Sequence, residues 1–393
     1  MGVRDVIIVG GGPGGASAAR VLAKRGLDVV LYEKRQEIGA PKRCAEGVAI
    51  DDFKKLGLLP PKNCLRQEID GSIVYAPNGK SITMDFKITA GYVLERKLFD
   101  KWLCEEAVRA GARVQAKTEI TGILKENGKV CGVKGSFMNE PFEERCKVLI
   151  AADGVETKIS RMVGLNTTCN PMVTDSGVQF EMVGIKMKDP KKLQIFVGNK
   201  IAPRGYVWVF PKGKDIANVG IGIIGKSDVP AITYLRRFVE NSLELKNGSI
   251  LEVNGGGIPV GGLLKKMTLD NFLVVGDAAH QVSPIHGGGI FEAQYAGIIA
   301  GEVVADAIKN GDTSEKALDP YNKRWWKERG DALSKVEKLR EIMEKMSDDD
   351  FNFFADNLTP ENLGDICSGK NMKILAKFVL KRPHLMRFAG AFI

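Results

Sequence analysis

The chain has 393 residues, 44% of them hydrophobic, which is enough for a large core divided into two or three structural parts. Its formal net charge of +9 suits nucleic acid, an anionic membrane surface or a phosphorylated substrate, and charge alone does not choose among these. Seven cysteines, scattered without metal-like pairs, argue against a secreted disulfide framework and against an iron–sulfur or other metal site. No apolar run is long enough to span a bilayer, and the N-terminal stretch lacks the pattern of a cleavable signal, so we expect a cytoplasmic protein.

The first informative segment is a glycine-rich turn near the start of the chain. The apolar run 6–9 predicts a buried parallel strand and residues 16–24 predict a helix, with the turn between them. Glycines in such a turn let the backbone approach a pyrophosphate and let the helix pack closely on the strand, while the helix N-terminus offers free N–H groups. We therefore assign cofactor binding to Gly10, Gly12, Gly14 and Gly15. The alternative is a glycine-rich turn with a purely structural role.

Glu33 follows the next predicted strand, residues 29–32. A carboxylate at the end of this strand accepts hydrogen bonds from ribose hydroxyls and repels a 2′-phosphate. The sequence thus argues against NADP in this first site.

Two later segments are consistent with the same nucleotide site. Residues 147–150 predict a strand that ends at Asp153 and Gly154, and residues 272–275 predict a strand followed by Gly276 and Asp277. The second carboxylate falls within reach of ribityl hydroxyls, and a helix from about Phe291 points its N–H groups at the flavin pyrimidine or the pyrophosphate. Together the three segments predict FAD, with contacts from Asp153, Asp277, Gly288, Gly289 and Ile290.

These segments resemble the FAD-dependent oxidoreductases that share the fold of aromatic-acid hydroxylases, and the resemblance covers most of residues 1–310. Three further motifs occur in order. Residues 43–47 are Arg-Cys-Ala-Glu-Gly, residues 92–100 contain Tyr-x-Leu-x-Arg-x-x-Phe-Asp, and residues 203–211 contain Pro-x-x-Tyr-x-Trp-x-Phe-Pro. On these motifs the chain is similar to the geranylgeranyl reductase family. The similarity is closest to the archaeal branch, whose members saturate the isoprenoid chains of ether lipids.

The resemblance implies further cofactor contacts. The loop with Arg43, Cys44, Ala45 and Gly47 is expected to meet the isoalloxazine. Cys44 either modulates flavin redox chemistry or pairs with another thiol, or it is a small residue that accommodates the ring by backbone contact, which we favour. Arg96 resembles the family's flavin-contacting arginine, with a surface ion pair as the alternative, and Ile120 matches a backbone contact to adenine.

Tyr206, Trp208 and Phe210 alternate along a predicted strand, so all three face one side. They form either a wall for an isoprenoid chain or the core face of the sheet, and the resemblance favours the wall. His280 and His286 flank the predicted flavin loop and titrate near neutral pH. We list His286 as a candidate proton donor, against the alternative of a buried histidine satisfied by backbone groups.

The resemblance implies saturation of carbon–carbon double bonds in geranylgeranyl chains, with hydride from flavin N5 and a proton from another group. The expected partners are a prenylated ether lipid and an external electron donor, either ferredoxin-like or a reduced nicotinamide, and no nucleic acid. Two other functional classes stay open. One is an FAD-dependent monooxygenase of a small aromatic, and the other is a non-catalytic flavoprotein or membrane-binding partner.

The predicted fold is mixed α/β, with a Rossmann-like FAD-binding domain, an interleaved antiparallel-sheet substrate domain and a C-terminal helical region. We assign residues 1–70, 92–168 and 262–310 to the first, residues 71–91 and 169–261 to the second and residues 311–393 to the third. Residues 210–216 predict a hairpin turn. Gly330 is expected to break the charged helical pattern of residues 320–346.

The C-terminal stretch from Lys370 to the end of the chain is basic and amphipathic, with lysines and arginines interleaved with apolar residues and no acidic residue. This pattern suits an anionic bilayer, so we expect peripheral association with the cytoplasmic face of the membrane. The alternative is a helix whose apolar face packs on its own domain while its lysines are solvated.

Overall fold

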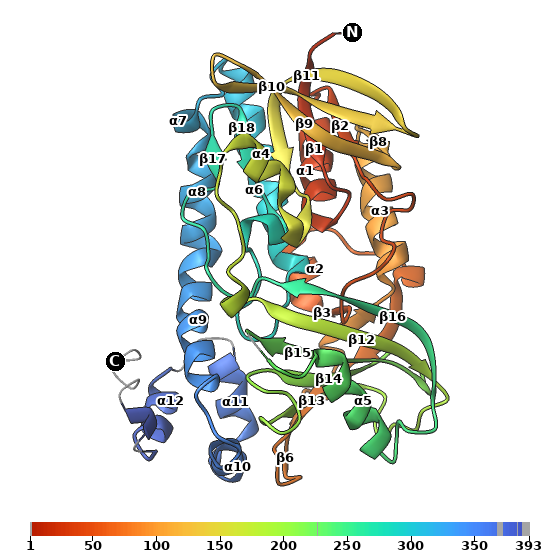
Figure 1. Cartoon of the computed structure of the whole chain (residues 1–393), viewed down its shortest axis with the longest axis vertical. Coiled ribbons are helices and arrows are strands. Elements are labelled where there is room, and N and C mark those ends of the chain that lie inside the picture. Colours follow the sequence, from red (N-terminus) through yellow and green to blue (C-terminus); the bar gives the residue numbers. More distant parts are fainter. Residues whose placement is uncertain (1, 226, 368–371, 383, 387–393) are drawn as a thin grey trace.

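Two large sheets lie at opposite ends of the long axis of the molecule, as Figure 1 shows. The computed structural model describes residues 2–225, 227–367, 372–382 and 384–386. A small third sheet lies between the two large ones, with β3 (Gly47–Ala49), β7 (Gly91–Leu94) and β4 (Leu65–Ile69). This mixed α/β architecture confirms the predicted fold class.

The first sheet has the order β17-β18-β11-β1-β2-β8, and β9 and β10 extend from β11. Its central strand β1 pairs in parallel with β2 and β11, and the apolar residues of the three strands are buried, because helices cover the sheet. The strands are β1 (Arg4–Val9), β2 (Val29–Tyr32), β8 (Arg113–Gln115), β9 (Thr118–Glu126), β10 (Lys129–Phe137), β11 (Glu140–Ala151), β17 (Thr268–Leu269) and β18 (Phe272–Val274). The predicted strands at residues 6–9 and 29–32 are thereby confirmed.

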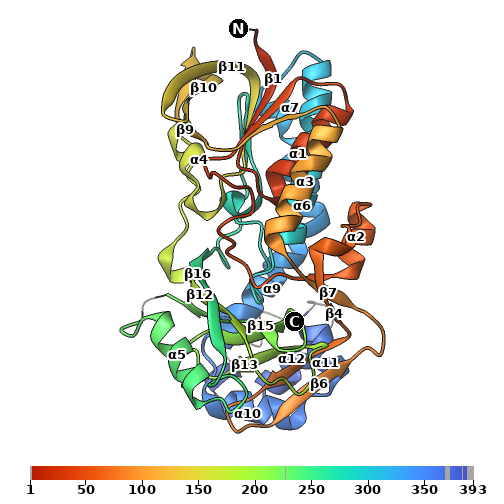
Figure 2. The same ribbon diagram turned by 90° about the vertical axis from the view of Figure 1, so that its right-hand side faces the viewer.

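Three helices pack together beside this sheet in Figure 2: α1 (Pro13–Lys24), α3 (Arg96–Arg109) and α6 (Ile290–Lys309). The helices predicted after the glycine turn and near Phe291 are confirmed, and Arg96 opens α3 as predicted. Shorter helices connect the layers, namely α2 (Ile50–Leu56), α4 (Lys158–Val163) and α7 (Glu315–Leu318).

The second sheet has the order β16-β12-β15-β14-β13-β5-β6. Its strands are β5 (Gly71–Tyr75), β6 (Ser81–Asp85), β12 (Asp175–Val183), β13 (Lys192–Val197), β14 (Tyr206–Pro211), β15 (Ile216–Ile224) and β16 (Ser249–Ile258). The predicted hairpin is confirmed, because β14 and β15 pair antiparallel across it. The sheet is antiparallel as predicted in its described pairings, with one exception. Strand β13 pairs in parallel with β5, a strand from a distant part of the chain.

The two faces of β14 serve different layers. Val207 and Val209 pack into an apolar cluster with Leu235 of helix α5 (Ala231–Asn241). The alternating residues Tyr206 and Trp208 face the other way, into a cavity. The period-2 pattern of the strand therefore puts the aromatic side chains on one side, as predicted.

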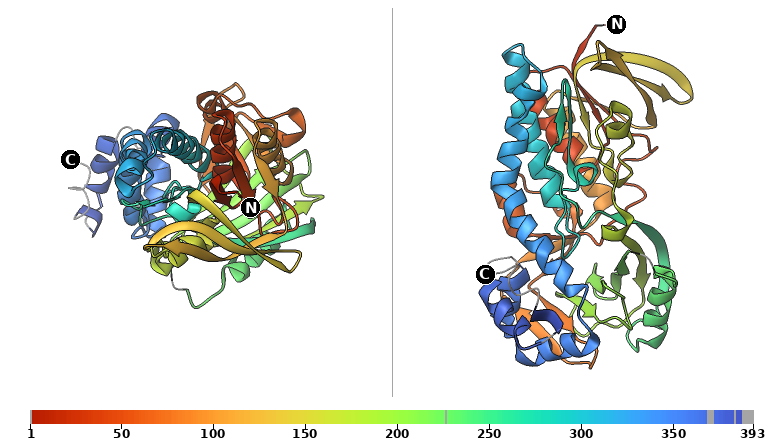
Figure 3. Two further views of the ribbon diagram at one scale, coloured as in Figure 1. Left: turned by 90° about the horizontal axis from the view of Figure 1, so that it is seen from above. Right: turned by 60° about the vertical axis from the view of Figure 1, so that its left-hand side comes forward.

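A nearly continuous helix runs along the molecule from the first sheet to the second, as the right-hand view of Figure 3 shows. It consists of α8 (Pro320–Trp325), a π-helical turn (Trp326–Gly330) and α9 (Asp331–Met343). The predicted break at Gly330 is wrong, because this residue keeps helical dihedrals of φ −57° and ψ −41°. A Cβ at Gly330 would lie 2.7 Å from the Trp326 ring, so the glycine serves tryptophan packing rather than chain reversal.

The C-terminal helices are α10 (Asp348–Asn357), α11 (Pro360–Cys367) and α12 (Met372–Val379). Ala376 and Val379 of α12 are buried, and Val379 belongs to an apolar cluster with Leu339 and Phe354. This packing supports the alternative interpretation of the C-terminal stretch, whereas Lys370 and the last seven residues lie outside the described residues. Among the helices that the structure describes, none has the length and apolar character needed to cross a membrane.

Candidate functional site

A cavity of about 930 Å³ joins the edge of the first sheet to the open face of the second. It is lined by residues from all three glycine-rich or acidic segments, by the 43–47 loop and by the aromatic strand β14. Of the predicted site residues, those on the cavity wall are Gly10, Gly12, Gly14, Glu33, Arg43, Cys44, Ala45, Gly47, Arg96, Ile120, Asp153, Tyr206, Trp208, Phe210, Asp277, His286, Gly288, Gly289 and Ile290. Gly15 lies behind the wall, where a Cβ would be 2.1 Å from the carbonyl oxygen of Gly10.

The first turn is shaped as a cradle for an anion. Gly10 has φ +114°, and a Cβ there would lie 2.1 Å from the carbonyl oxygen of Ala152, so only glycine fits. Gly12 has open space beside it, and it caps α1 without a side-chain acceptor for the first N–H groups of the helix. These N–H groups and the positive end of the helix dipole suit a pyrophosphate. Glu33 accepts hydrogen bonds from the N–H groups of Gly11 and Arg35, both at 2.9 Å, which orient its carboxylate at the rim of the cradle.

The two later acidic residues also fit a nucleotide cofactor. Asp153 accepts an N–H bond from Ile159 at Oδ2, while its buried Oδ1 has no partner among the described residues. Asp277 lies on the cavity wall, and burial raises the pKa of its carboxyl group. Helix α6 begins at Ile290, and its N-cap Gly289 offers no side-chain acceptor, so the first N–H groups of the helix are open toward the cavity.

The 43–47 loop contacts both layers of the site. Cys44 receives an N–H bond at Sγ from Glu46, and its carbonyl oxygen accepts a bond of 3.0 Å from Nε2 of Gln179. Burial raises the pKa of the Cys44 thiol, which disfavours a thiolate at neutral pH. Arg96 forms a bidentate ion pair with Asp100, with both distances 2.8 Å. This pair lies at the cavity wall rather than on the outer surface.

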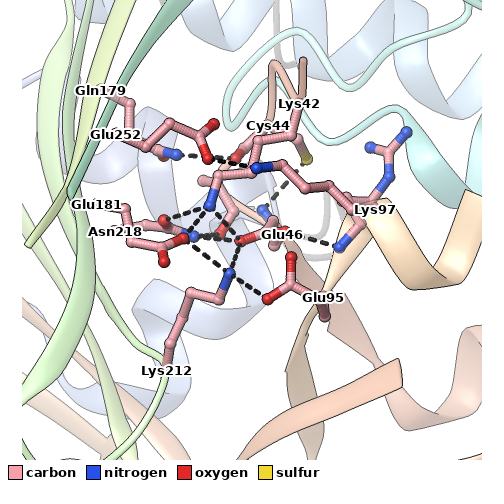
Figure 4. A network of polar contacts seen from close by, with 12 residues as sticks. Lys42, Cys44, Glu46, Glu95, Lys97, Gln179, Glu181, Lys212, Asn218 and Glu252 are labelled. Atoms are coloured by element: carbon pink, nitrogen blue, oxygen red, sulfur yellow. Dashed lines mark hydrogen bonds and ion pairs between the residues drawn. The ribbon is translucent and has the colours of Figure 1, made fainter. Parts of the chain in front are cut away.

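A buried network of charges holds this loop against the second sheet, as Figure 4 shows. Lys212 is 1% exposed, and its ammonium group lies 2.8 Å from Glu46, 3.1 Å from Glu95 and 3.0 Å from Glu181. Lys42, also buried, pairs with Glu46 and Glu181. Burial opposes the charge on Glu181, yet the hydrogen bonds from the two lysines lower its pKa to about 2.

The same network fixes the start of helix α3. Oε1 of Glu46 accepts the backbone N–H of Arg96 at 2.7 Å, and its Oε2 accepts Nδ2 of Asn218 at 2.6 Å. Glu46 is fully buried and has φ +74°. It therefore connects the loop, the helix and the sheet in one arrangement.

Sequence reasoning missed these charged residues. Lys212 lies in the predicted turn at residues 210–216, where a lysine is expected to be exposed to solvent. Glu181 and Asn218 lie in strands, and neither belongs to a recognisable motif. The only available signal was the acidic residue in the Arg-Cys-Ala-Glu-Gly motif, which carried no assigned role.

The aromatic wall is wider than the sequence indicated. The Trp208 ring lies on Gly220, where a Cβ would come within 2.3 Å of it, and its Nε1 donates to Gln179 at 2.8 Å. Leu193 and Ile195 of β13 extend the apolar surface beside it. Three side chains that the sequence did not assign to the site form a further part of the wall, namely Met343 of α9, Phe351 of α10 and Leu363 of α11.

The two histidines have different surroundings. His280 is 3% exposed and stays off the cavity wall, with Nδ1 at 2.7 Å from the carbonyl oxygen of Gly262, which makes it a satisfied core histidine. His286 lies on the wall, and its Nδ1 accepts the N–H of Gly288 at 3.1 Å. The residue is exposed, and desolvation by the surrounding protein lowers the pKa of its imidazole. The Tyr206 hydroxyl donates to the carbonyl oxygen of His286 at 2.8 Å and so connects the glycine loop to the aromatic wall.

Comparisons with known proteins agree with this geometry. Residues 174–258 match the model of the geranylgeranyl reductase catalytic domain, and residues 8–47 match an NAD(P)-binding Rossmann-like domain. The chain is 42% identical over 390 residues to the digeranylgeranylglycerophospholipid reductase of Methanocaldococcus jannaschii, covering 98% of this chain and 97% of that protein. The chain belongs to the geranylgeranyl reductase family. A second member with the same name, from Methanocella arvoryzae, is 41% identical over 389 residues, covering 98% of this chain and 97% of that protein.

Solved structures extend the comparison for this geranylgeranyl reductase family member. A geranylgeranyl bacteriochlorophyll reductase-like protein from Thermoplasma acidophilum has a TM-score of 0.92 and 34% identity, covering 100% of this chain and 99% of that chain. A myxobacterial FAD-dependent chondrochloren halogenase has a TM-score of 0.71 and 19% identity, covering 85% and 82%, and it shares the fold alone. The family resemblance is thereby confirmed, and a flavin is the cofactor that the family and fold imply.

Proposed function

We propose that this chain reduces carbon–carbon double bonds in the geranylgeranyl chains of archaeal ether-lipid precursors, with FAD as its cofactor. The observation that carries the proposal is the single cavity that joins a dinucleotide cradle to an apolar wall. The names of the full-length relatives support the substrate class.

Different residues of the cavity wall bind the cofactor and the isoprenoid chain. Gly10, Gly12 and the start of α1 hold the pyrophosphate, while Glu33 and Asp277 accept hydroxyl hydrogens of the nucleotide and ribityl chain. Bound FAD in its reduced form supplies a hydride. The wall around Trp208 binds the isoprenoid chain, because each buried methylene contributes about 0.8 kcal/mol.

The test is anaerobic incubation of dithionite-reduced protein with digeranylgeranylglycerophospholipid, with flavin absorbance and product mass followed together. The expected result is flavin reoxidation with mass gains of one hydrogen pair per step. Reduced flavin that persists with the lipid but reacts rapidly with dioxygen, consuming it with NADPH and an aromatic substrate, would instead indicate a monooxygenase.

We further propose peripheral association with the anionic membrane face and an external electron donor, ferredoxin-like or a reduced nicotinamide. The net charge of +9 and the exposed lysines of the last described helix support the membrane contact. Because the apolar side of α12 packs on the protein itself, the contact is electrostatic rather than insertional.

A further inference from the structure

Asp175 is a buried carboxyl group to which the proposed reaction assigns no role. It begins β12, opposite Ile224 of β15 and Ile258 of β16, and is only 6% exposed. Its Oδ1 is buried without a hydrogen-bond partner among the described residues. A charged carboxylate with an unpaired oxygen is costly in such a place, so the neutral acid is favoured.

The other oxygen, Oδ2, lies beside the aromatic wall. A Cβ built on Gly222 would be 3.0 Å from Oδ2 of Asp175 and 3.7 Å from Cζ3 of Trp208. Gly222 is also the register partner of Tyr206. The carboxyl group therefore flanks the surface on which the proposed isoprenoid chain lies.

Asp175 also lines a second, open hollow of about 650 Å³, here called the outer hollow, together with Thr174, Ser176 and Asn254. The two hollows share part of their lining, because Asp175, Asn254 and Gly256 belong to both. Asp175 therefore lies where the apolar cavity meets a solvent-accessible space. Water from that space can return a proton that the carboxyl group loses.

The groups that face Asp175 set its charge state. The charges of Arg340 and Glu344 act on Asp175 from the end of α9, and the charge of Arg204 acts on Glu344. Tyr206 lies on β14, which is separated from the strand of Asp175 by β15. Burial is the largest influence and, with the negative charge of Glu344, raises the pKa of Asp175 to about 7 against the opposing effect of Arg340. A substantial fraction of the Asp175 carboxyl groups is therefore protonated at neutral pH.

We infer that Asp175 donates the proton that completes saturation of the double bond, an inference that rests on the proposed function. One alkene carbon receives the hydride, so the flavin is oxidised and the alkene reduced. The π electrons of the alkene form a C–H bond with the proton of Asp175 at the other carbon. The O–H bond breaks, its electron pair stays on the carboxylate, and water in the outer hollow returns a proton.

Three other groups on the cavity wall, those of Tyr206, His286 and Cys44, are poorer proton donors or are occupied. The Tyr206 hydroxyl already donates to the carbonyl oxygen of His286, and burial raises its pKa. The lowered pKa of His286 makes it neutral at pH 7, and the raised pKa of Cys44 makes its thiol a poor donor.

The test compares the wild type with D175N, H286Q and E344Q in anaerobic single-turnover reduction of the lipid across pH 5 to 9. We expect D175N to lose about a hundredfold or more in rate while flavin content and lipid binding persist, in line with the usual contribution of a general acid. The wild-type rate should fall above pH 7. E344Q should remain active but shift this fall to lower pH, because the charge of Glu344 raises the pKa of Asp175.

A second readout is independent of turnover. The free energy of unfolding of the flavin-free protein should fall relative to D175N as pH rises from about 4 to about 7, because the raised pKa of the folded state makes ionisation unfavourable. A D175N rate within about threefold of wild type, or an E344Q profile that does not shift, would overturn the inference. Failure of the wild type to saturate the lipid would instead overturn the proposed function, while the unfolding measurement would still report the charge state of Asp175. If D175N does not fold, the E344Q profile decides.

Discussion

At the scale of single residues, the most demanding side chain is the ammonium group of Lys212. The group is buried, and its positive charge neutralises part of the negative charge of three carboxylates, those of Glu46, Glu95 and Glu181. Replacing it with Met leaves these carboxylates short of a counter-charge, so we expect Lys212→Met to lower the free energy of unfolding by about 3–5 kcal/mol. Chemical denaturation measures this loss.

The matched control for that variant is Lys80→Met, because Lys80 forms an exposed ion pair. Exposed pairs contribute about 1 kcal/mol or less, so this variant should unfold almost as the wild type does. Equal effects at the two positions would contradict the role of the buried network.

Trp208 is the residue on which binding of the isoprenoid chain depends most directly. Trp208→Ala should weaken lipid binding by about 1–3 kcal/mol, roughly tenfold to hundredfold, because it removes the largest ring of the wall. The control is Val207→Ala on the same strand, whose side chain packs toward α5 and should affect stability but not lipid affinity. Titration with the lipid, followed by flavin fluorescence, distinguishes the two variants, and an unchanged affinity in Trp208→Ala would refute the wall.

At the scale of elements, the long helix from α8 to α9 depends on tryptophan packing at one glycine. A Cβ at Gly330 would lie 2.8 Å from the ring of Trp325, which is fully buried. We expect Gly330→Ala to lower the melting temperature and to cost about 1–3 kcal/mol, since overpacking outweighs the better helix propensity of alanine.

Gly364 in helix α11 provides the opposite case, because the nearest atom to its Cβ would be Sδ of Met84 at 3.9 Å. There Gly364→Ala should stabilise the protein by up to about 1 kcal/mol. If Gly330→Ala instead raised the free energy of unfolding, Trp325 and Trp326 would be able to move aside without destabilising the protein.

At the scale of the whole molecule, charge and shape bear on the membrane contact. The helix α12 lies near the end of the long axis that carries the second sheet, far from α7 (Figure 1). We consider the exposed Lys373 and Lys377 of this helix and Lys381 just after it. Replacing all three with Gln should weaken binding to anionic vesicles by about 3 kcal/mol at low salt, at about 1 kcal/mol per lysine near the surface. Vesicle flotation measures the fraction of protein bound. Added salt should also weaken binding of the wild type, because it screens the attraction between the lysines and the anionic lipids.

The control replaces three exposed lysines near the opposite end, Lys24, Lys309 and Lys316, with Gln. These changes remove the same net charge, so flotation should stay close to wild type if the contact is local. An equal loss in both triple variants would mean that net charge alone attracts the protein.

The features that could be predicted from the sequence are local. The glycine turn, the acid at residue 33, the hairpin and the side taken by Tyr206 and Trp208 follow from neighbouring residues, because turn chemistry and strand periodicity act over a few positions. The family motifs added the likeness to geranylgeranyl reductases.

The contacts between residues far apart in the chain became visible only in the folded structure. Lys42 and Glu181 are 139 positions apart, yet they belong to one buried network. Strand β13 pairs in parallel with β5, and no local sequence pattern predicts this pairing. The burial of Asp175 between the cavity and the outer hollow arises in the same way. Burial and charge pairing depend on packing of whole elements, so they appear only when those elements are in place.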